Sequence, residues 1–157
     1  MKRATIKISV ITPILANYAG EERRNSFSRD RDGRVVFQHT WWYTAILAAI
    51  GQTRTRGIKP GDISISPVVE VETDRYQRQY GDKGTRDHEC IPARAPVTLE
   101  AVVSDHVTKS GLSTIFEHLG NFVGMSPFGH NLGYGRFNVD SIDVAEGDQP
   151  PPLPNEK

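Results

Sequence analysis

The chain has 157 residues, a length typical of one domain with a substantial core and too short for two. Lys+Arg and Asp+Glu each total 19, so the formal net charge is zero and gives no indication of a nucleic-acid partner. Cys90 is the only cysteine, which excludes a disulfide framework and a thiolate metal cluster.

The hydropathy pattern is that of a soluble protein. The longest apolar run, at residues 45–50, is far too short to span a bilayer. No secretory apolar segment follows the basic first residues. We therefore expect a soluble, cytoplasmic protein with no membrane partner.

The positive charge lies in the first two thirds of the chain. Residues 1–20 sum to +3, residues 21–94 to +2 and residues 95–157 to −5. The middle segment is rich in arginine, whose planar guanidinium group suits phosphates and stacks on bases. Acidic residues are interleaved with these arginines, so an ordinary solvated surface is the alternative interpretation.

The first elements predicted along the chain are a strand and a hairpin. Residues 4–15 alternate apolar and polar side chains and are rich in β-branched residues, the pattern of a strand with one buried face. The Asp32-Gly33 dipeptide is typical of a tight turn. We therefore expect residues 34–37 to pair with residues 26–28.

A helix follows over residues 41–50, with Thr40 as its cap and Gly51 as its end. It opens with three consecutive aromatic residues, which cannot all face one side of a helix. Trp41 or Tyr43 then faces a surface away from the core. There it would offer a platform for base stacking or an oligomer contact, unless the preceding insertion covers all three rings.

The remaining elements complete a β-α-β-β-α-β order, with strands at residues 62–72, 96–104 and 136–144 and a helix at residues 111–122. This order predicts an α+β, ferredoxin-like βαββαβ fold: a four-stranded antiparallel sheet with two helices on one face and two long insertions. Residues 1–145 are expected to form a single domain. Residues 146–157 are rich in proline and are expected to form an extended, disordered tail.

The stretch at residues 124–137, GMSPFGHNLGYGRF, contains four glycines among aromatic residues and one arginine. Glycine is favoured where φ is positive or where another backbone or a ligand approaches closely. We therefore predict that this stretch contacts a nucleic acid through Gly124, Gly129, Gly133, Tyr134, Gly135 and Arg136. The alternative is a turn with one strand glycine that only permits packing.

This element order and this glycine-rich stretch resemble the RAMP superfamily, the repeat-associated RNA-binding proteins of CRISPR systems. Members carry two Gly-apolar-Gly triplets before a strand; here the second is Gly133-Tyr134-Gly135, whereas the first has Ser126 in place of its second glycine. Members also often carry a proline after an Asp-Gly segment before the first helix, and this chain lacks it. The resemblance implies an RNA-binding subunit of an antiviral effector complex, or a phage or mobile-element relative with the same fold.

The two insertions supply further predicted contacts with nucleic acid, because arginine and aromatic side chains alternate in them. In the resembled family, an insertion between the central strands is often a thumb that folds over RNA. The predicted contacts are Arg23, Arg24, Arg29, Arg31, Arg75, Tyr76, Arg78, Tyr80 and Arg86, together with Trp41. A solvated surface hairpin is the alternative.

The histidines bear on whether the protein is an enzyme. None of the five lies at metal-ligand spacing, and no phosphate-loop or dinucleotide motif is present, so we expect neither metal nor cofactor. Metal-independent RNA cleavage needs a general base and a general acid. His39, Tyr43 and His130 would supply these groups if the protein were an endoribonuclease.

The sequence therefore predicts a non-catalytic protein that binds RNA or single-stranded DNA and assembles along the strand, as a homo-oligomer or as a subunit of a ribonucleoprotein complex. Two alternatives stay open. One is a metal-independent endoribonuclease that uses His39 or His130. The other is an assembly component of a phage or mobile element.

Overall fold

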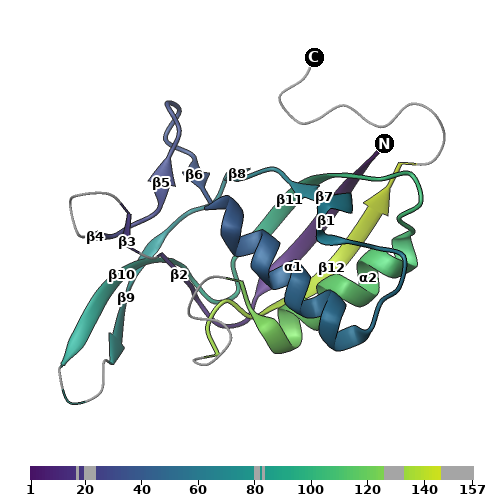
Figure 1. Ribbon diagram of the computed structural model, residues 1–157. Coiled ribbons are helices and arrows are strands. Elements are labelled where there is room, and N and C mark those ends of the chain that lie inside the picture. Colours follow the sequence, from purple (N-terminus) through teal and green to yellow (C-terminus); the bar gives the residue numbers. More distant parts are fainter. Residues whose placement is uncertain (17, 20–23, 80–81, 83, 126–132, 146–157) are drawn as a thin grey trace.

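The computed structural model describes residues 1–145 except residues 17, 20–23, 80–81, 83 and 126–132 (Figure 1). Its architecture is α+β, as predicted, with mostly antiparallel sheets and two α-helices. The predicted tail at residues 146–157 lies outside the described residues. Neither helix of the described part combines the length and the apolar character that crossing a membrane requires.

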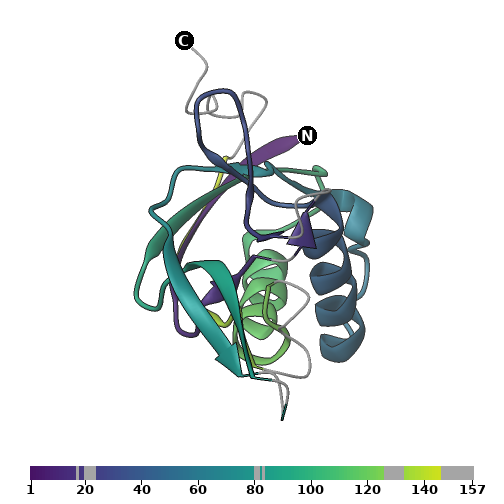
Figure 2. The same cartoon turned by 90° about the vertical axis from the view of Figure 1, so that its left-hand side faces the viewer.

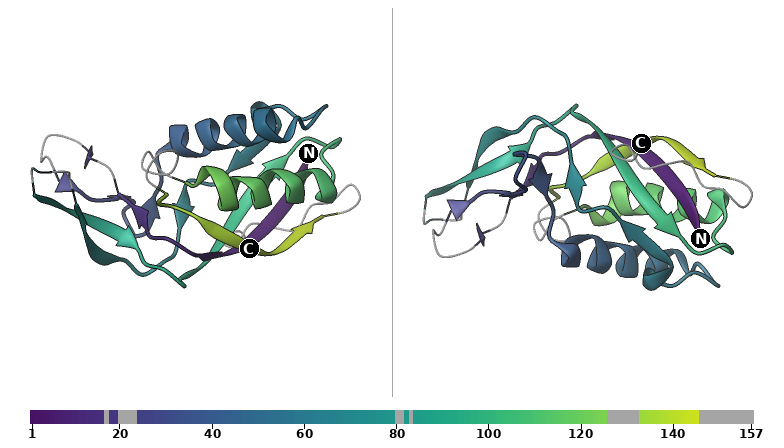
Figure 3. Two further views of the ribbon diagram at one scale, coloured as in Figure 1. Left: turned by 90° about the horizontal axis from the view of Figure 1, so that it is seen from below. Right: turned by 90° about the horizontal axis from the view of Figure 1, so that it is seen from above.

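The largest sheet has four strands, and each pair of neighbours is antiparallel. In spatial order they are β12 (Phe137–Val144), β1 (Lys2–Val10), β11 (Pro96–Val103) and β7 (Ile63–Ile65). The helices α1 (His39–Thr53) and α2 (Lys109–His118) lie side by side on one face of this sheet (Figure 1, Figure 3). The predicted four-stranded sheet with two helices is therefore present.

The buried face of this sheet comes from alternating residues, as the sequence pattern indicates. In the central strand β1 every second residue from Ala4 to Val10 is at most 3% exposed, namely Ala4, Ile6, Ile8 and Val10. An apolar stripe of α2, formed by Leu112, Ile115 and Phe116, is fully buried in the same core. Each such burial contributes about 1.5–3 kcal/mol relative to an exposed side chain, so this layer supplies much of the stability.

The bounds of α1 differ from those predicted. Its cap is Gln38 in extended conformation, so Thr40 lies inside the first turn, and the helix continues through Gly51 to Thr53. A glycine ends a helix when it adopts the left-handed conformation. Here Arg54 takes that conformation, with φ 56°, and its N–H donates to the carbonyl of Ile50.

Two predicted strands are each divided by a proline, which lacks the N–H that a ladder needs. The first is split at Pro13 into β1 and β2 (Ile14–Leu15), and β2 joins a different sheet. The second is split at Pro67 into β7, which follows a 3-10 turn, η1 (Pro60–Asp62), and β8 (Val68–Val69). The chain therefore leaves the main sheet earlier at both places than the alternation predicts.

The insertions form two smaller sheets beside the main one (Figure 2). The second insertion is a hairpin of β9 (Asp74–Gln79) and β10 (Thr85–Ile91). The first contributes four short strands, β3 (Tyr18–Ala19), β4 (Arg24–Asn25), β5 (Ser28–Arg29) and β6 (Val35–Val36). β3 and β4 join the sheet of β10, whereas β5, β6 and β8 form the third sheet. The β5–β6 pairing confirms the predicted hairpin around Gly33.

The hairpin is continuous with the two central strands of the main sheet. β1 leads into β2, and β10 leads into β11. β1 pairs with β11 in the main sheet, and β2 pairs with β10 in the neighbouring sheet. Between the sheets, the N–H of Arg94 donates to the carbonyl of Val10 at 2.7 Å, and the N–H of Val10 donates to the carbonyl of Ala95 at 3.0 Å. A two-stranded ribbon therefore passes from one sheet into the other.

Two helical glycines give opposite predictions for the same change to alanine. A Cβ on Gly120, in the π-helical turn η3 (Leu119–Val123), would lie 2.3 Å from the carbonyl oxygen of Phe137, whereas a Cβ on Gly51 would meet nothing within 4 Å. We expect Gly120→Ala to destabilise the fold by about 1–3 kcal/mol through overpacking. We expect Gly51→Ala to stabilise it by about 0.5–1 kcal/mol through helix propensity. Urea unfolding of both variants checks this, and equal midpoints would contradict the described packing.

Candidate functional site

The two faces of the β9–β10 hairpin carry different chemistry. His88 lies directly opposite Tyr76, and Arg86 lies directly opposite Arg78, so these four side chains share one face. We call Tyr76, Arg78, Arg86 and His88 the basic face. The opposite face carries Arg75 together with two carboxylates, Asp87 and Glu89.

The arginines on the carboxylate side are ion-paired. Arg75 pairs with Asp87, and the hydrogen bond that it donates to this carboxylate raises the pKa of Arg75. Arg29, which β5 presents to the same side, pairs with Glu89. Both arginines were predicted to contact nucleic acid, and both have a carboxylate partner within the fold that neutralises the guanidinium charge.

Glu89 is buried and links three segments. Its carboxylate accepts from the backbone N–H of Phe27 at 2.8 Å, from Oγ1 of Thr73 at 2.7 Å and from the guanidinium of Arg29. Burial alone would raise the pKa of Glu89, but these donors outweigh it and lower the pKa below its ordinary value. Glu89 is therefore a carboxylate that stays ionised and fastens the hairpin to the first insertion.

On the basic face, the hairpin meets the glycine-rich stretch. The hydroxyl of Tyr76 lies 3.2 Å from that of Tyr134, and their rings are 5.5 Å apart, edge to face. The hydrogen bond with Tyr76, together with partial burial, raises the pKa of Tyr134, so Tyr134 is an uncharged phenol at neutral pH. The structure thus brings together two predicted groups of contacts that lie 58 residues apart in sequence.

His88 is the buried member of this face and is 1% exposed. Its Nδ1 is 2.8 Å from the carbonyl oxygen of Ala16, and its Nε2 is 3.3 Å from Nε of Arg78. A carbonyl only accepts and the guanidinium Nε–H only donates, so the imidazole carries its proton on Nδ1 and is neutral. Burial, reinforced by the positive charge of Arg78, lowers the pKa of His88.

The end of the glycine-rich stretch is fixed to the link between β1 and β2. Oγ1 of Thr12 donates to the carbonyl of Gly133 at 2.7 Å and accepts from the N–H of Arg136 at 3.0 Å. The N–H of Gly135 donates to the carbonyl of Pro13 at 2.9 Å. These bonds place Tyr134, which lies between them in sequence, against the hairpin.

Gly135 is needed for packing within the protein, whereas the sequence analysis predicted that a nucleic acid approaches it. It is buried with φ 72°, and a Cβ there would lie 1.8 Å from the carbonyl oxygen of Met125. The approach that excludes a side chain is therefore made by the protein's own backbone. By contrast, a Cβ on Gly133 would meet nothing within 4 Å.

Arg136 and Gly124 also serve the fold. Nη1 of Arg136 donates to the carbonyl of Asn121 at 2.5 Å, so its guanidinium caps carbonyls at the end of η3. Gly124 is buried with φ 82°, and its N–H donates to the carbonyl of Leu119 at 2.7 Å. Each of these contacts gives a structural reason for the residue.

Of the two rings that the sequence offered as exposed aromatic groups, Trp41 is buried, which does not fit its predicted contact with nucleic acid. Trp41 is 6% exposed and packs in an aromatic cluster with Phe27 and Phe37. The first insertion covers the start of α1 and takes this ring into the core. Tyr43 is the member of the aromatic triplet that faces outward, at 46% exposed.

The structure describes the remaining predicted residues only in part. Arg31 is exposed, and the backbone of Arg24 belongs to β4. Arg23, Tyr80, Gly129 and His130 lie outside the described residues, as do the side chains of Arg24 and His39. The grouping of His39, Tyr43 and His130 therefore stays a prediction. Among the described residues, no cluster of histidine, cysteine and acidic side chains could hold a metal ion.

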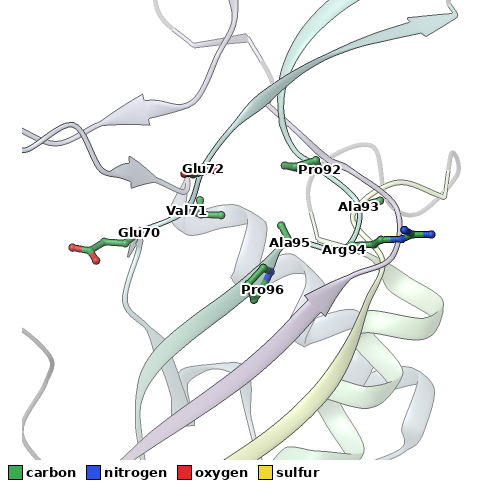
Figure 4. Close-up of a pocket in the computed structure, with 8 residues that line it drawn as sticks. All are labelled: Glu70, Val71, Glu72, Pro92, Ala93, Arg94, Ala95 and Pro96. Carbon is green, nitrogen blue, oxygen red and sulfur yellow. The ribbon is translucent and has the colours of Figure 1, made fainter.

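A pocket lies apart from this site, between the chain that leads into β9 and the turn before β11 (Figure 4). Its lining is mainly apolar, with Glu70 and Arg94 pointing to opposite sides, and consists of Glu70, Val71, Glu72, Pro92, Ala93, Arg94, Ala95 and Pro96. Two carboxylates against one guanidinium do not favour a polyanion. None of the predicted site residues lines it.

No protein-family model and no curated protein matches the chain. Its fold is similar to that of a chain in the cryo-EM structure of the type III-B Cmr-beta bound to cognate target RNA, with 13% identity and a TM-score of 0.59. That match covers 91% of this chain and 60% of the other, so this chain spans about 60% of its length. A chain of a type IV-B CRISPR complex matches with 10% identity and a TM-score of 0.58, covering 99% of this chain and 95% of the other. Such identities establish likeness of fold alone.

The sequence analysis missed Thr12, His88 and Glu89 as residues that build the site. His88 had a detectable signal. The hairpin turn between β9 and β10 puts residues of equal parity on the same face, so positions 76, 78, 86 and 88 could have been grouped from the alternation alone. Thr12 and Glu89 act through partners that sequence spacing does not reveal.

Two glycines of the stretch give a matched pair of variants. We expect Gly135→Ala to destabilise the fold by about 2 kcal/mol or more, because its Cβ would overlap the backbone of Met125. We expect Gly133→Asn to change stability by less than about 1 kcal/mol, because asparagine tolerates the left-handed conformation and the space is open. Thermal unfolding measures both, and a fully stable Gly135→Ala protein would restore a ligand-contact role for this glycine.

The second prediction concerns Glu89. We expect Glu89→Gln to cost about 1–3 kcal/mol at neutral pH, because the amide cannot satisfy all three donors. Since the folded pKa lies below the ordinary value of 4.5, the carboxylate's contribution is complete above pH 4.5 and is lost as pH falls through the folded pKa. The stability difference between the wild type and the variant should therefore shrink in acid.

Urea unfolding of both proteins as a function of pH measures this difference. Asp87→Asn is the control, since its ion pair with Arg75 is exposed and an exposed pair contributes little. A Glu89→Gln protein as stable as the wild type at neutral pH would show that the buried carboxylate does not fasten the hairpin.

Proposed function

We propose that this chain is a non-catalytic subunit of a ribonucleoprotein complex, and that it binds RNA or single-stranded DNA through the basic face of the β9–β10 hairpin together with Tyr134. The fold similarity to chains of two CRISPR complexes supports this proposal, one of those complexes being bound to target RNA. The fold similarity does not identify a binding surface, which we assign to the basic face and Tyr134.

The topology supports a place in the RAMP superfamily and the ferredoxin-like fold. The main elements follow the order β1-α1-β7-β11-α2-β12, and their sheet order is β12-β1-β11-β7. Two β-α-β units interleave in this way in the ferredoxin-like arrangement. The β9–β10 hairpin leaves the sheet between two core strands, as the thumb of the resembled family does.

The observation that carries the proposal is the pairing of Arg78 with Arg86. Cross-strand partners lie side by side, so both guanidinium groups belong to one face, whereas the other face of the same hairpin sets Arg75 against Asp87. An anionic strand over the basic face would contact both guanidinium groups. Tyr76 and Tyr134 add aromatic surface beside the two guanidinium groups, and stacking on such surface contributes about 1–3 kcal/mol per base.

Assembly along the strand is part of the proposal. β12 lies at one end of the sheet order, and an edge strand offers its backbone groups to another chain. Its exposed residues include Asn138, Asp140 and Asp143, and the carboxylates among them make this edge complementary to a basic surface.

The test compares three variants of one hairpin. We expect Arg78→Gln and Arg86→Gln each to weaken binding of a short labelled RNA or single-stranded DNA about tenfold, and to reduce the salt slope by about 0.7. Arg75→Gln should leave affinity and slope nearly unchanged, because Arg75 faces the other side and is paired with Asp87. Fluorescence anisotropy between about 50 and 200 mM salt measures both quantities.

Circular dichroism verifies that all three variants are folded. Equal affinity of Arg78→Gln, Arg86→Gln and the wild type for every oligonucleotide would reject the basic face as the binding surface. The two alternatives remain predictions with their own outcomes. Cleavage of the RNA in EDTA would favour the endoribonuclease with His39 or His130, and salt-insensitive capture of a protein would favour an assembly component.

A further inference from the structure

We propose that His88 is a positioning residue of the basic face: its buried neutral imidazole holds the Arg78 guanidinium in the orientation that meets a nucleic-acid phosphate, and protonation of the imidazole releases it. This inference rests on the proposed function and deepens it. It concerns a residue that makes no contact with the ligand itself.

The two nitrogens of His88 have separate partners. Nδ1–H donates to the carbonyl of Ala16, just after β2, and this bond fixes the ring to the neighbouring strand. Nε2 then has its lone pair directed at Nε–H of Arg78, 3.3 Å away. A bidentate contact with a phosphate is made by the two terminal nitrogens of a guanidinium group, so the bond from Nε to His88 is compatible with such a contact.

Protonation of His88 removes this arrangement. The imidazolium has no lone pair to accept from Arg78, and it places a second positive charge beside the guanidinium. The site is buried, so water screens the repulsion less than at the surface. Arg78 must then turn away from Nε2, and the two partners of the bond separate.

Burial and the charged groups around His88 determine whether its pKa is raised or lowered. Burial is the largest influence and disfavours the protonated ring, as do Arg78 and Arg75, whereas the hydrogen bond to the carbonyl of Ala16 and the charge of Asp87 favour it. Asn25 on β4, the partner of His88 across the parallel bridge, is uncharged. The remaining ionisable side chains on the paired hairpin strands and the adjoining tyrosine are Asp74, Tyr76, Arg86, Glu89, Cys90 and Tyr134.

The ring is therefore neutral at pH 7, and it gains its proton only below the ordinary pKa of 6.5. Binding should be independent of pH above 6.5 and should weaken as pH falls below it. A histidine that contacted a phosphate directly would give the opposite dependence, because its charged form would bind more tightly.

Two substitutions separate the nitrogens. His88→Asn keeps a side-chain donor near Nδ1, for the carbonyl of Ala16, and removes the acceptor for Arg78. His88→Gln reaches further and can place its amide oxygen near the position of Nε2. We expect His88→Asn to weaken binding of the labelled oligonucleotide about tenfold, the effect of losing one charge-assisted hydrogen bond, and His88→Gln to retain most of the affinity without the pH dependence.

A double-mutant cycle tests whether the effect passes through Arg78. His88→Asn should add no further loss in the Arg78→Gln background, because the group that it positions is already absent. An additive loss would mean that His88 acts independently of Arg78 and would overturn the inference. An affinity that rises in acid would overturn it as well.

A measurement on the wild type needs no variant and no nucleic acid. Nitrogen-15 NMR of the imidazole should show the Nδ1–H tautomer at neutral pH, and the Nε–H signal of Arg78 should shift as His88 titrates. The Nε2–H tautomer, or an Arg78 signal that ignores the titration, would reject the inference even if His88→Asn fails to fold. Unchanged binding by Arg78→Gln would reject the proposed function instead, so the two failures are distinguishable.

Discussion

The carboxylate of Glu89 is the interaction on which the arrangement of the insertions depends. It collects a backbone N–H from Phe27, a hydroxyl from Thr73 and a guanidinium from Arg29. These residues precede α1, precede β9 and lie in β5, so one ionised group joins both insertions at a buried point. Short strands of two residues cannot hold a sheet together by themselves. This carboxylate therefore holds the first insertion against the base of the hairpin.

The same arrangement sorts the arginines of an otherwise neutral chain. Those that turn toward Glu89 and Asp87 are neutralised within the fold, and Arg78 and Arg86 are gathered on the opposite face of the same two strands. A total charge of zero therefore does not show how the arginines are distributed over the two faces. The neutral state of His88 fits this arrangement, because a protonated ring would place a second positive charge beside the guanidinium of Arg78.

Periodicity predicted the elements that pack through one repeating face. β1, β11 and α2 depend on local spacing, and each overlaps the range of residues predicted for it. Roles that depend on a distant partner were not predictable. Position 135 has room only for glycine, because the backbone of Met125 lies against it. Trp41 is covered by Phe27 and Phe37. After Pro13 and after Pro67 the chain continues in a different sheet. Within the described part of the glycine-rich stretch, Tyr134 meets the basic face through Tyr76, a contact that sequence spacing does not reveal.

The ribbon that joins the hairpin to the main sheet has a mechanical consequence. β9–β10 is clamped through β2 and β10 to β1 and β11, the two innermost strands of the core, with backbone hydrogen bonds across the joint. Because paired strands form its base, the hairpin can bend along its length but cannot rotate about a loop at its base. A force applied to it would load the central ladder in shear, where many bonds resist together. A surface mounted in this way is stiff before any partner arrives, so little ordering entropy has to be lost on contact.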